Sequence, residues 1–131
     1  MYGLYNKESN EIKSKEINKI GISVRNWNDN NYINHIANFL NKLNKGKDFS
    51  VDILPFHKGE DIIISNRLKN KLKMKVNVLD YTDDFDKINK VYSTFDLFIG
   101  VRFHSLVFAA INLVPFIGIS LFSYFQASAA I

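Results

Sequence analysis

The feature that most constrains the fold is a regular alternation of two kinds of apolar pattern along the chain. Short apolar runs rich in β-branched residues predict buried strands at residues 19–24, 49–54, 76–79, 97–100 and 116–119. Between them, apolar residues recur every three to four positions, which predicts helices. This alternation is typical of a parallel sheet covered on both faces. We therefore predict a Rossmann-like, doubly wound α/β domain of about five strands in the order 3-2-1-4-5.

The helix boundaries follow from caps and charges. Asp29 is a candidate N-cap for the first helix, and Gly46 is its stop signal. Asp61 and its neighbour Glu60 lie where the N-terminus of the second helix favours negative charge, and the Thr-Asp-Asp sequence at 82–84 is expected to cap the third. The side chains expected to face the core from the first and third helices are Ile33, Ile36, Ala37, Leu40, Leu43, Phe85, Ile88, Val91, Tyr92 and Phe95.

Length and composition limit the chain to one core. It has 131 residues, of which 47% are hydrophobic, and this is too short for two ordinary domains. We expect residues 1–18 to be a linker or the tail of a missing N-terminal half. Residues 19–120 then form the Rossmann-like domain, and 121–131 form an atypical apolar tail.

Charge and cysteine content narrow the functional classes. The absence of cysteine excludes disulfides and thiolate zinc sites, and makes the cytoplasm the default location. The net charge of +4 comes from lysines interleaved with polar and acidic residues, which is typical of a solvated surface. With only three arginines, a nucleic-acid partner is not expected.

The segment 105–125 carries no charged residue over a length that could cross a bilayer. Asn112, Pro115 and the change from a helical to a strand pattern favour a buried helix-strand unit of a parallel sheet instead. Membrane association through this segment is the alternative.

The predicted strand order gathers polar side chains at one edge of the sheet. Strands one and four are neighbours, and ligands of doubly wound sheets bind where the connections diverge, at the carboxyl ends. Arg25 follows strand one, and Gly100, Arg102 and His104 end or follow strand four. We expect the two arginines and the histidine to converge on one crevice.

The residue types at this crevice suit a small, multiply charged anion. Gly100 permits a tight exit from the strand, and the N–H groups of Phe103 to Ser105 open a helix, which is a ready anion site. Arginine offers bidentate donors to carboxylate or phosphate, and histidine offers a mobile proton near neutral pH.

Two further residues are second-tier candidates. His57 lies at the carboxyl end of strand two, and Trp27 could stack on a ligand or pack against the next helix. Asp80, Asp83 and Asp84 are expected to cap the third helix, so no metal site is predicted.

Two separated segments resemble a known family. Residues 100–110, Gly-Val-Arg-Phe-His-Ser-Leu-Val-Phe-Ala-Ala, and 114–120, Val-Pro-Phe-Ile-Gly-Ile-Ser, closely resemble the signature of polysaccharide pyruvyl transferases. Ile-Ser-Val-Arg-Asn-Trp at 22–27 resembles that family's other arginine-bearing strand end. The resemblance spans about residues 19–120 and implies the C-terminal half of a glycosyltransferase B arrangement.

The resemblance also implies a reaction. Phosphoenolpyruvate, as donor substrate and without a separate cofactor, gives its pyruvyl group to a sugar of a cell-surface polysaccharide as a ketal. By this resemblance Arg25 and Arg102 hold the donor, the Phe103 backbone lies near it, and His104 is the acid/base. The expected partners are phosphoenolpyruvate, a saccharide acceptor and the missing N-terminal half, and self-association stays open.

Departures from the family pattern leave alternatives. The family's lysine after Gly-Ile-Ser is absent, with Tyr124 near its place, so we expect an incomplete enzyme that retains the donor site. One alternative is a glycosyltransferase half that binds a nucleotide sugar in the same crevice. Another is a noncatalytic interaction module or membrane-anchored fragment built on the apolar C-terminal stretch.

Overall fold

The computed structural model, which describes residues 16–28 and 30–121, contains one parallel five-stranded sheet. Its order, β3-β2-β1-β4-β5, confirms the predicted Rossmann-like arrangement. The strands are β1 (Lys19–Ser23), β2 (Ser50–Ile53), β3 (Val76–Val78), β4 (Leu97–Gly100) and β5 (Phe116–Gly118). The helices are α2 (Tyr32–Gly46), α3 (Asp61–Lys71), α4 (Phe85–Tyr92) and α5 (Phe103–Ile111).

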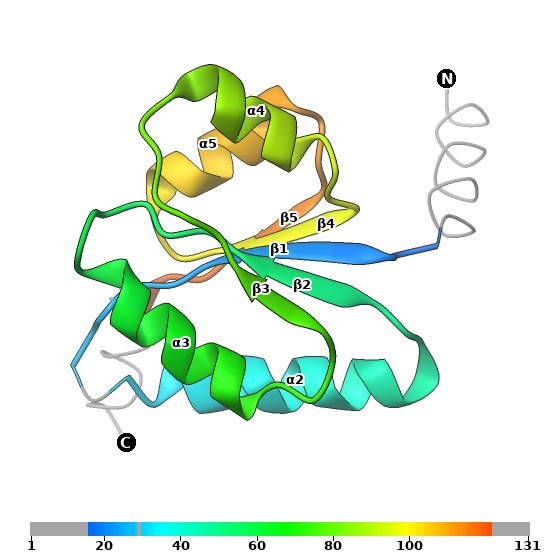
Figure 1. Cartoon of the computed structure of the whole chain (residues 1–131). Helices are drawn as coiled ribbons and strands as arrows, with labels where there is room; N and C mark the ends of the chain where they lie inside the picture. The colour runs from blue at the N-terminus through cyan, green and yellow to red at the C-terminus, as the bar shows by residue number, and fades with distance from the viewer. Residues whose placement is uncertain (1–15, 29, 122–131) are drawn as a thin grey trace.

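The helices form two layers, with α2 and α3 on one face of the sheet and α4 and α5 on the other (Figure 1). Residues 1–15 of the predicted linker and 122–131 of the predicted tail lie outside the described residues.

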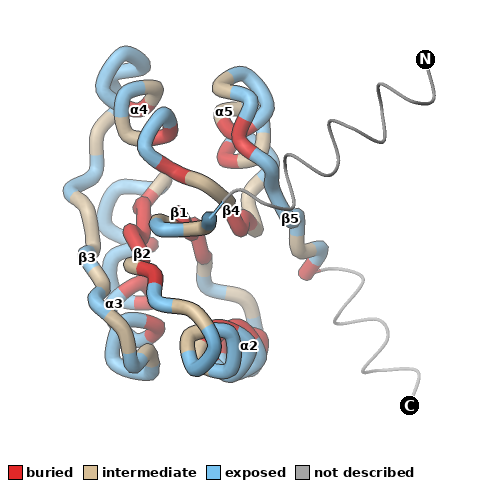
Figure 2. The backbone as a smooth tube through the Cα atoms, turned by 90° about the vertical axis from the view of Figure 1, so that its right-hand side faces the viewer, coloured by how far each residue is buried: buried red, intermediate tan, exposed pale blue. Residues whose placement is uncertain are grey.

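The core lies on both faces of the central strands. Ile20, Ile22 and Ile53 are almost fully buried and pack with α2 and α3, whereas Phe98 and Tyr92 belong to the cluster under α4 and α5. Figure 2 shows this burial concentrated on the inner strands. Strands that are apolar on both faces are what a parallel sheet covered by two helical layers requires.

Helix α2 begins later than its sequence signals indicated. Its N-cap residue is Asn31, which makes no side-chain capping bond, and Asp29, the predicted cap, lies outside the described residues. Ile33 and Leu40 are buried as predicted, but Leu43 is exposed. Leu43 lies in the last turn of α2, beyond Leu40, which is the last buried residue of that helix.

Helix α4 has the predicted cap and one misassigned side chain. Asp84 accepts hydrogen bonds from the backbone N–H groups of Asp86 and Lys87. Phe85, predicted to face the core, is 68% exposed. It packs edge-on against Phe108 of α5, with ring centroids 5.6 Å apart, at the rim of a surface groove.

The unit formed by α5 and β5 is far less buried than its uncharged sequence suggested. Buried side chains of α5 are Ser105 and Ala109 alone, and all of β5 is exposed (Figure 2). The reason is that β5 is an edge strand, paired only with β4 within the described part of the chain. No helix of residues 16–28 or 30–121 is long and apolar enough to span a membrane.

Gly21 allows a close approach between the sheet and the segment after α4. A Cβ atom at Gly21 would lie 2.3–2.6 Å from ring atoms of Phe95, and a buried aromatic ring has little room to move. We expect Gly21→Ala to lower the free energy of unfolding by about 2–3 kcal/mol, through overpacking. Urea denaturation measures this. Gly46→Ala is the control, since a Cβ there meets nothing within 4 Å, and a loss as large as that of Gly21→Ala would contradict the packing argument.

Candidate functional site

A groove of about 630 Å³ lies at the carboxyl end of the sheet, between the segments that follow β2 and β3 and the helix α5. Three of the residues singled out from the sequence line it: His57, Arg102 and His104. The structure therefore brings together side chains from the ends of two strands that are separated by β1. The groove is within the volume range typical of small-molecule sites.

One wall of this groove is aromatic and was not predicted as part of a site. Phe56, Phe85 and Phe108 line the groove, and Phe108 contacts both of the others, with ring centroids 6.1 Å from Phe56 and 5.6 Å from Phe85. Tyr92 packs beneath them, 5.8 Å from Phe108. An apolar wall beside a few polar groups is the usual composition of a ligand pocket.

Arg102 is held by a bidentate ion pair with Asp61. Its Nε and Nη2 atoms donate to Asp61 Oδ2 and Oδ1 at 3.2 and 2.9 Å, and Nη2 also lies 3.9 Å from Glu60 Oε2. The planar guanidinium suits this fork geometry, which fixes orientation as well as charge. Within the described residues these bonds leave Nη1 of Arg102 for a ligand.

Asp61 is the central residue of this arrangement, and sequence reasoning gave it only a helix-dipole role. Asp61 is fully buried, and its Oδ2 atom also accepts hydrogen bonds from the backbone N–H groups of Phe56 and His57 at 3.0 and 2.9 Å. One carboxylate therefore fixes both the turn after β2 and the arginine after β4. The signal available in the sequence was an acidic residue at the start of a helix that opens at the carboxyl edge of the sheet.

The two histidines of the groove are exposed. His104 lies in the first turn of α5, its ring edge-on to Phe103, whose side chain is 75% exposed. His57 Nδ1 is 3.5 Å from Glu60 Oε2, so a protonated His57 would have a partner. Both rings can therefore exchange protons with solvent or with a ligand in the groove.

Gly100 and Ser105 have packing roles in this structure. A Cβ at Gly100 would lie 2.5 Å from Ser105 Oγ and 2.7 Å from Phe98 Cε2, so only glycine lets α5 approach β4 this closely. Ser105 is fully buried, and its hydroxyl donates to the Arg102 carbonyl oxygen. Its own carbonyl accepts from the Tyr92 hydroxyl at 2.8 Å. Both residues thus shape the turn that presents Arg102 and His104.

Arg25 does not line the groove, although it lies at the same edge of the sheet. Its guanidinium carbon is 5.6 Å from the centroid of the Trp27 ring, and Trp27 packs against the core. The Arg25 Nε, Trp27 Nε1 and Ser23 Oγ atoms are buried and have no hydrogen-bond partner within the described part of the chain. These are unsatisfied polar atoms at the end of β1, next to the expected site.

Tyr32 lies at the end of β1, hydrogen-bonded to the backbone of Arg25. Its hydroxyl accepts from the Arg25 N–H at 2.9 Å and donates to the Arg25 carbonyl oxygen. Burial raises its pKa to about 12, against the opposing effect of its hydrogen bond with Arg25. The charges of Asp61, Arg25 and Arg102 also affect the pKa of this hydroxyl, so all three side chains lie close enough to interact with it electrostatically.

Fold and site together define a doubly wound α/β domain with a groove at the carboxyl ends of its strands, lined by aromatic residues, Arg102 and two histidines. A sequence model of the family described as polysaccharide pyruvyl transferase matches residues 2–123. The chain belongs to this family of transferases, which implies a saccharide acceptor. A search of curated proteins found no match.

Proposed function

We propose that the groove binds phosphoenolpyruvate and that the protein transfers its pyruvyl group to a saccharide. The observation that carries this proposal is the position of Arg102 and His104 on one groove, within the segment that resembles the family signature, in a chain of that family. A donor with one carboxylate and one phosphate needs cationic donors at a site that also admits a small apolar methylene group.

Each residue has a chemical task in this proposal. Arg102, oriented by Asp61, offers Nη1 to the carboxylate or phosphate of the donor. The first N–H groups of α5, near Phe103, add donors at a helix N-terminus that has no side-chain cap. Arg25 supplies a second positive charge at the same edge, and its buried Nε has no described partner.

His104 moves the protons. A saccharide hydroxyl adds to the central carbon of phosphoenolpyruvate, forming a C–O bond, while the methylene carbon gains a proton and becomes methyl. A second hydroxyl then forms the other C–O bond, and the bond to phosphate breaks. Two hydroxyl protons are lost, one is gained by carbon and one leaves with inorganic phosphate. The exposed imidazole of His104 can deliver the first proton or accept one from the hydroxyl.

The reaction is tested by following the donor carbon and the phosphate together. With phosphoenolpyruvate labelled with ¹³C at its central carbon and a saccharide acceptor, we expect inorganic phosphate release and a new ketal carbon signal in NMR spectra. Phosphate release with free pyruvate as the labelled product would indicate hydrolysis and contradict transfer. Turnover of a uridine-diphosphate sugar in place of phosphoenolpyruvate would support the glycosyltransferase alternative.

A further inference from the structure

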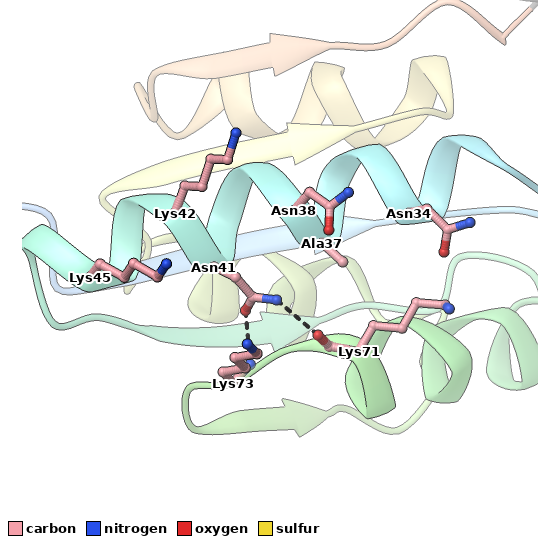
Figure 3. Close-up of a pocket in the computed structure, with 8 residues that line it drawn as sticks. All are labelled: Asn34, Ala37, Asn38, Asn41, Lys42, Lys45, Lys71 and Lys73. Atoms are coloured by element: carbon pink, nitrogen blue, oxygen red, sulfur yellow. Dashed lines mark hydrogen bonds between the residues drawn. The ribbon is translucent and has the colours of Figure 1, made fainter.

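A second groove, of about 450 Å³, lies between α2 and α3, in the helical layer on the other face of the sheet from α4 and α5 (Figure 3). Four lysines line it: Lys42 and Lys45 from α2, and Lys71 and Lys73 at the end of α3 and just beyond it. None of the four makes an ion pair with another described residue. We call this site the lysine groove.

The one acidic residue of helices α2 and α3 is Asp61, which is buried and paired with Arg102, so it does not neutralise these lysines. Residues 32–47 and 62–75 contain eight lysines and arginines and no aspartate or glutamate. In the segment 81–92, by contrast, three aspartates accompany two lysines. The positive charge that looked evenly interleaved along the sequence is therefore segregated onto one helical layer. Such segregation raises the local concentration of anionic partners.

The lysine groove has a fixed polar floor. Asn41 Nδ2 donates to the Lys71 carbonyl oxygen at 2.9 Å, and Asn41 Oδ1 accepts from the Lys73 N–H at 2.9 Å, as Figure 3 shows. These two bonds join α2 to the end of α3. The exposed amides of Asn34 and Asn38 continue the lining along α2, and offer donors and acceptors that suit hydroxyl groups.

The residues that line the groove favour one class of anionic partner over the others. Among the described residues that line it, the only apolar one is Ala37, which is buried, so none of these residues can insert into a lipid surface. The same described lining includes no aromatic residue on which the bases of a single-stranded nucleic acid could stack, and no arginine. Lysines with asparagine amides instead fit a chain that alternates carboxylates with hydroxyls, as acidic polysaccharides do.

We propose that the lysine groove binds a carboxylate-bearing polysaccharide. The identity of that polymer rests on the proposed function, because each pyruvyl ketal leaves one carboxylate on the saccharide and makes the product a polyanion. The groove would hold already modified stretches of the chain on one helical layer, while the donor groove lies beside the other. It is therefore a second site, separate from the residues that bind the donor.

Binding of fluorescently labelled polygalacturonate to the whole chain, at about 0.15 M salt, tests this proposal. We expect the combined substitution Lys42→Gln, Lys45→Gln, Lys71→Gln and Lys73→Gln to weaken binding by roughly tenfold or more. The control, Lys87→Gln with Lys90→Gln on α4, removes two positive charges where the test variant removes four, and it should retain binding within about twofold. Neutral dextran should not compete.

Several results would overturn the proposal. Equal weakening by the control variant would show a general effect of net charge, and competition by dextran would remove the role of the carboxylates. Tighter lysine-dependent binding of duplex DNA or of phosphatidylglycerol vesicles would assign the groove to another partner. The polygalacturonate assay contains no phosphoenolpyruvate. Its result can therefore be interpreted even if a separate measurement shows that the protein does not bind the donor.

Discussion

Replacing Arg102 by methionine is expected to lower the free energy of unfolding by about 3–5 kcal/mol. The physical reason is that Asp61 would lose its charged partner. Asp61 is fully buried, and without the guanidinium its carboxylate keeps, among the described residues, only the N–H groups of Phe56 and His57 as partners. Removing one member of a buried pair leaves an uncompensated charge, and this costs much more than the pair itself contributes.

A double-mutant cycle measured by urea denaturation isolates this effect. Asp61→Asn combined with Arg102→Met should recover part of the loss, because no charge then remains buried. Arg67→Met is the matched control, since Arg67 is an exposed arginine of α3, and its substitution should change stability by no more than about 0.5 kcal/mol. Additive losses from the two single substitutions would contradict the coupling between Asp61 and Arg102.

Replacing His104 by asparagine is expected to lower the rate of phosphate release from phosphoenolpyruvate by roughly 10²–10⁴-fold, the usual contribution of a general acid or base. Asparagine keeps a polar side chain of similar size but cannot transfer a proton near neutral pH. Because Arg102 and the start of α5 carry donor binding in the proposal, the affinity for phosphoenolpyruvate should change little. Stability should also change little, since His104 is exposed.

The control for His104 is His35→Asn on α2, in the opposite helical layer, which should leave the rate unchanged. A His104→Asn variant with full activity would remove His104 from the mechanism. His57→Asn then becomes the informative variant, because His57 is the other histidine that lines the same groove.

The topology was predictable because it depends on patterns that the sequence displays directly. Five short apolar runs separated by helical periods leave few arrangements of a parallel sheet, and the observed strand order is the predicted one. The same reasoning placed Arg102 and His104 beyond the carboxyl end of β4, where they are found. These inferences need only the order of elements along the chain.

The pairing of Asp61 with Arg102 was not predictable in the same way. It joins residues 41 positions apart, across the end of β1. It depends on the path of the chain after β2 and β4, which sets the position of each side chain. The exposure of Phe85 and Leu43 was missed for a related reason. Hydrophobic periodicity identifies an apolar face, but it does not say whether that face meets the core of this domain or the rim of a groove.

The central claim is that the groove containing Arg102 and His104 is a phosphoenolpyruvate site. Calorimetric titration of the chain with phosphoenolpyruvate and, separately, with a uridine-diphosphate sugar tests it most directly. We predict one site for phosphoenolpyruvate with a Kd of about 1 mM or tighter, weakened at least roughly tenfold by Arg102→Lys, which keeps the charge facing Asp61 but loses the bidentate fork. Binding of the nucleotide sugar without binding of phosphoenolpyruvate would contradict the account, as would phosphoenolpyruvate binding that Arg102→Lys leaves unchanged.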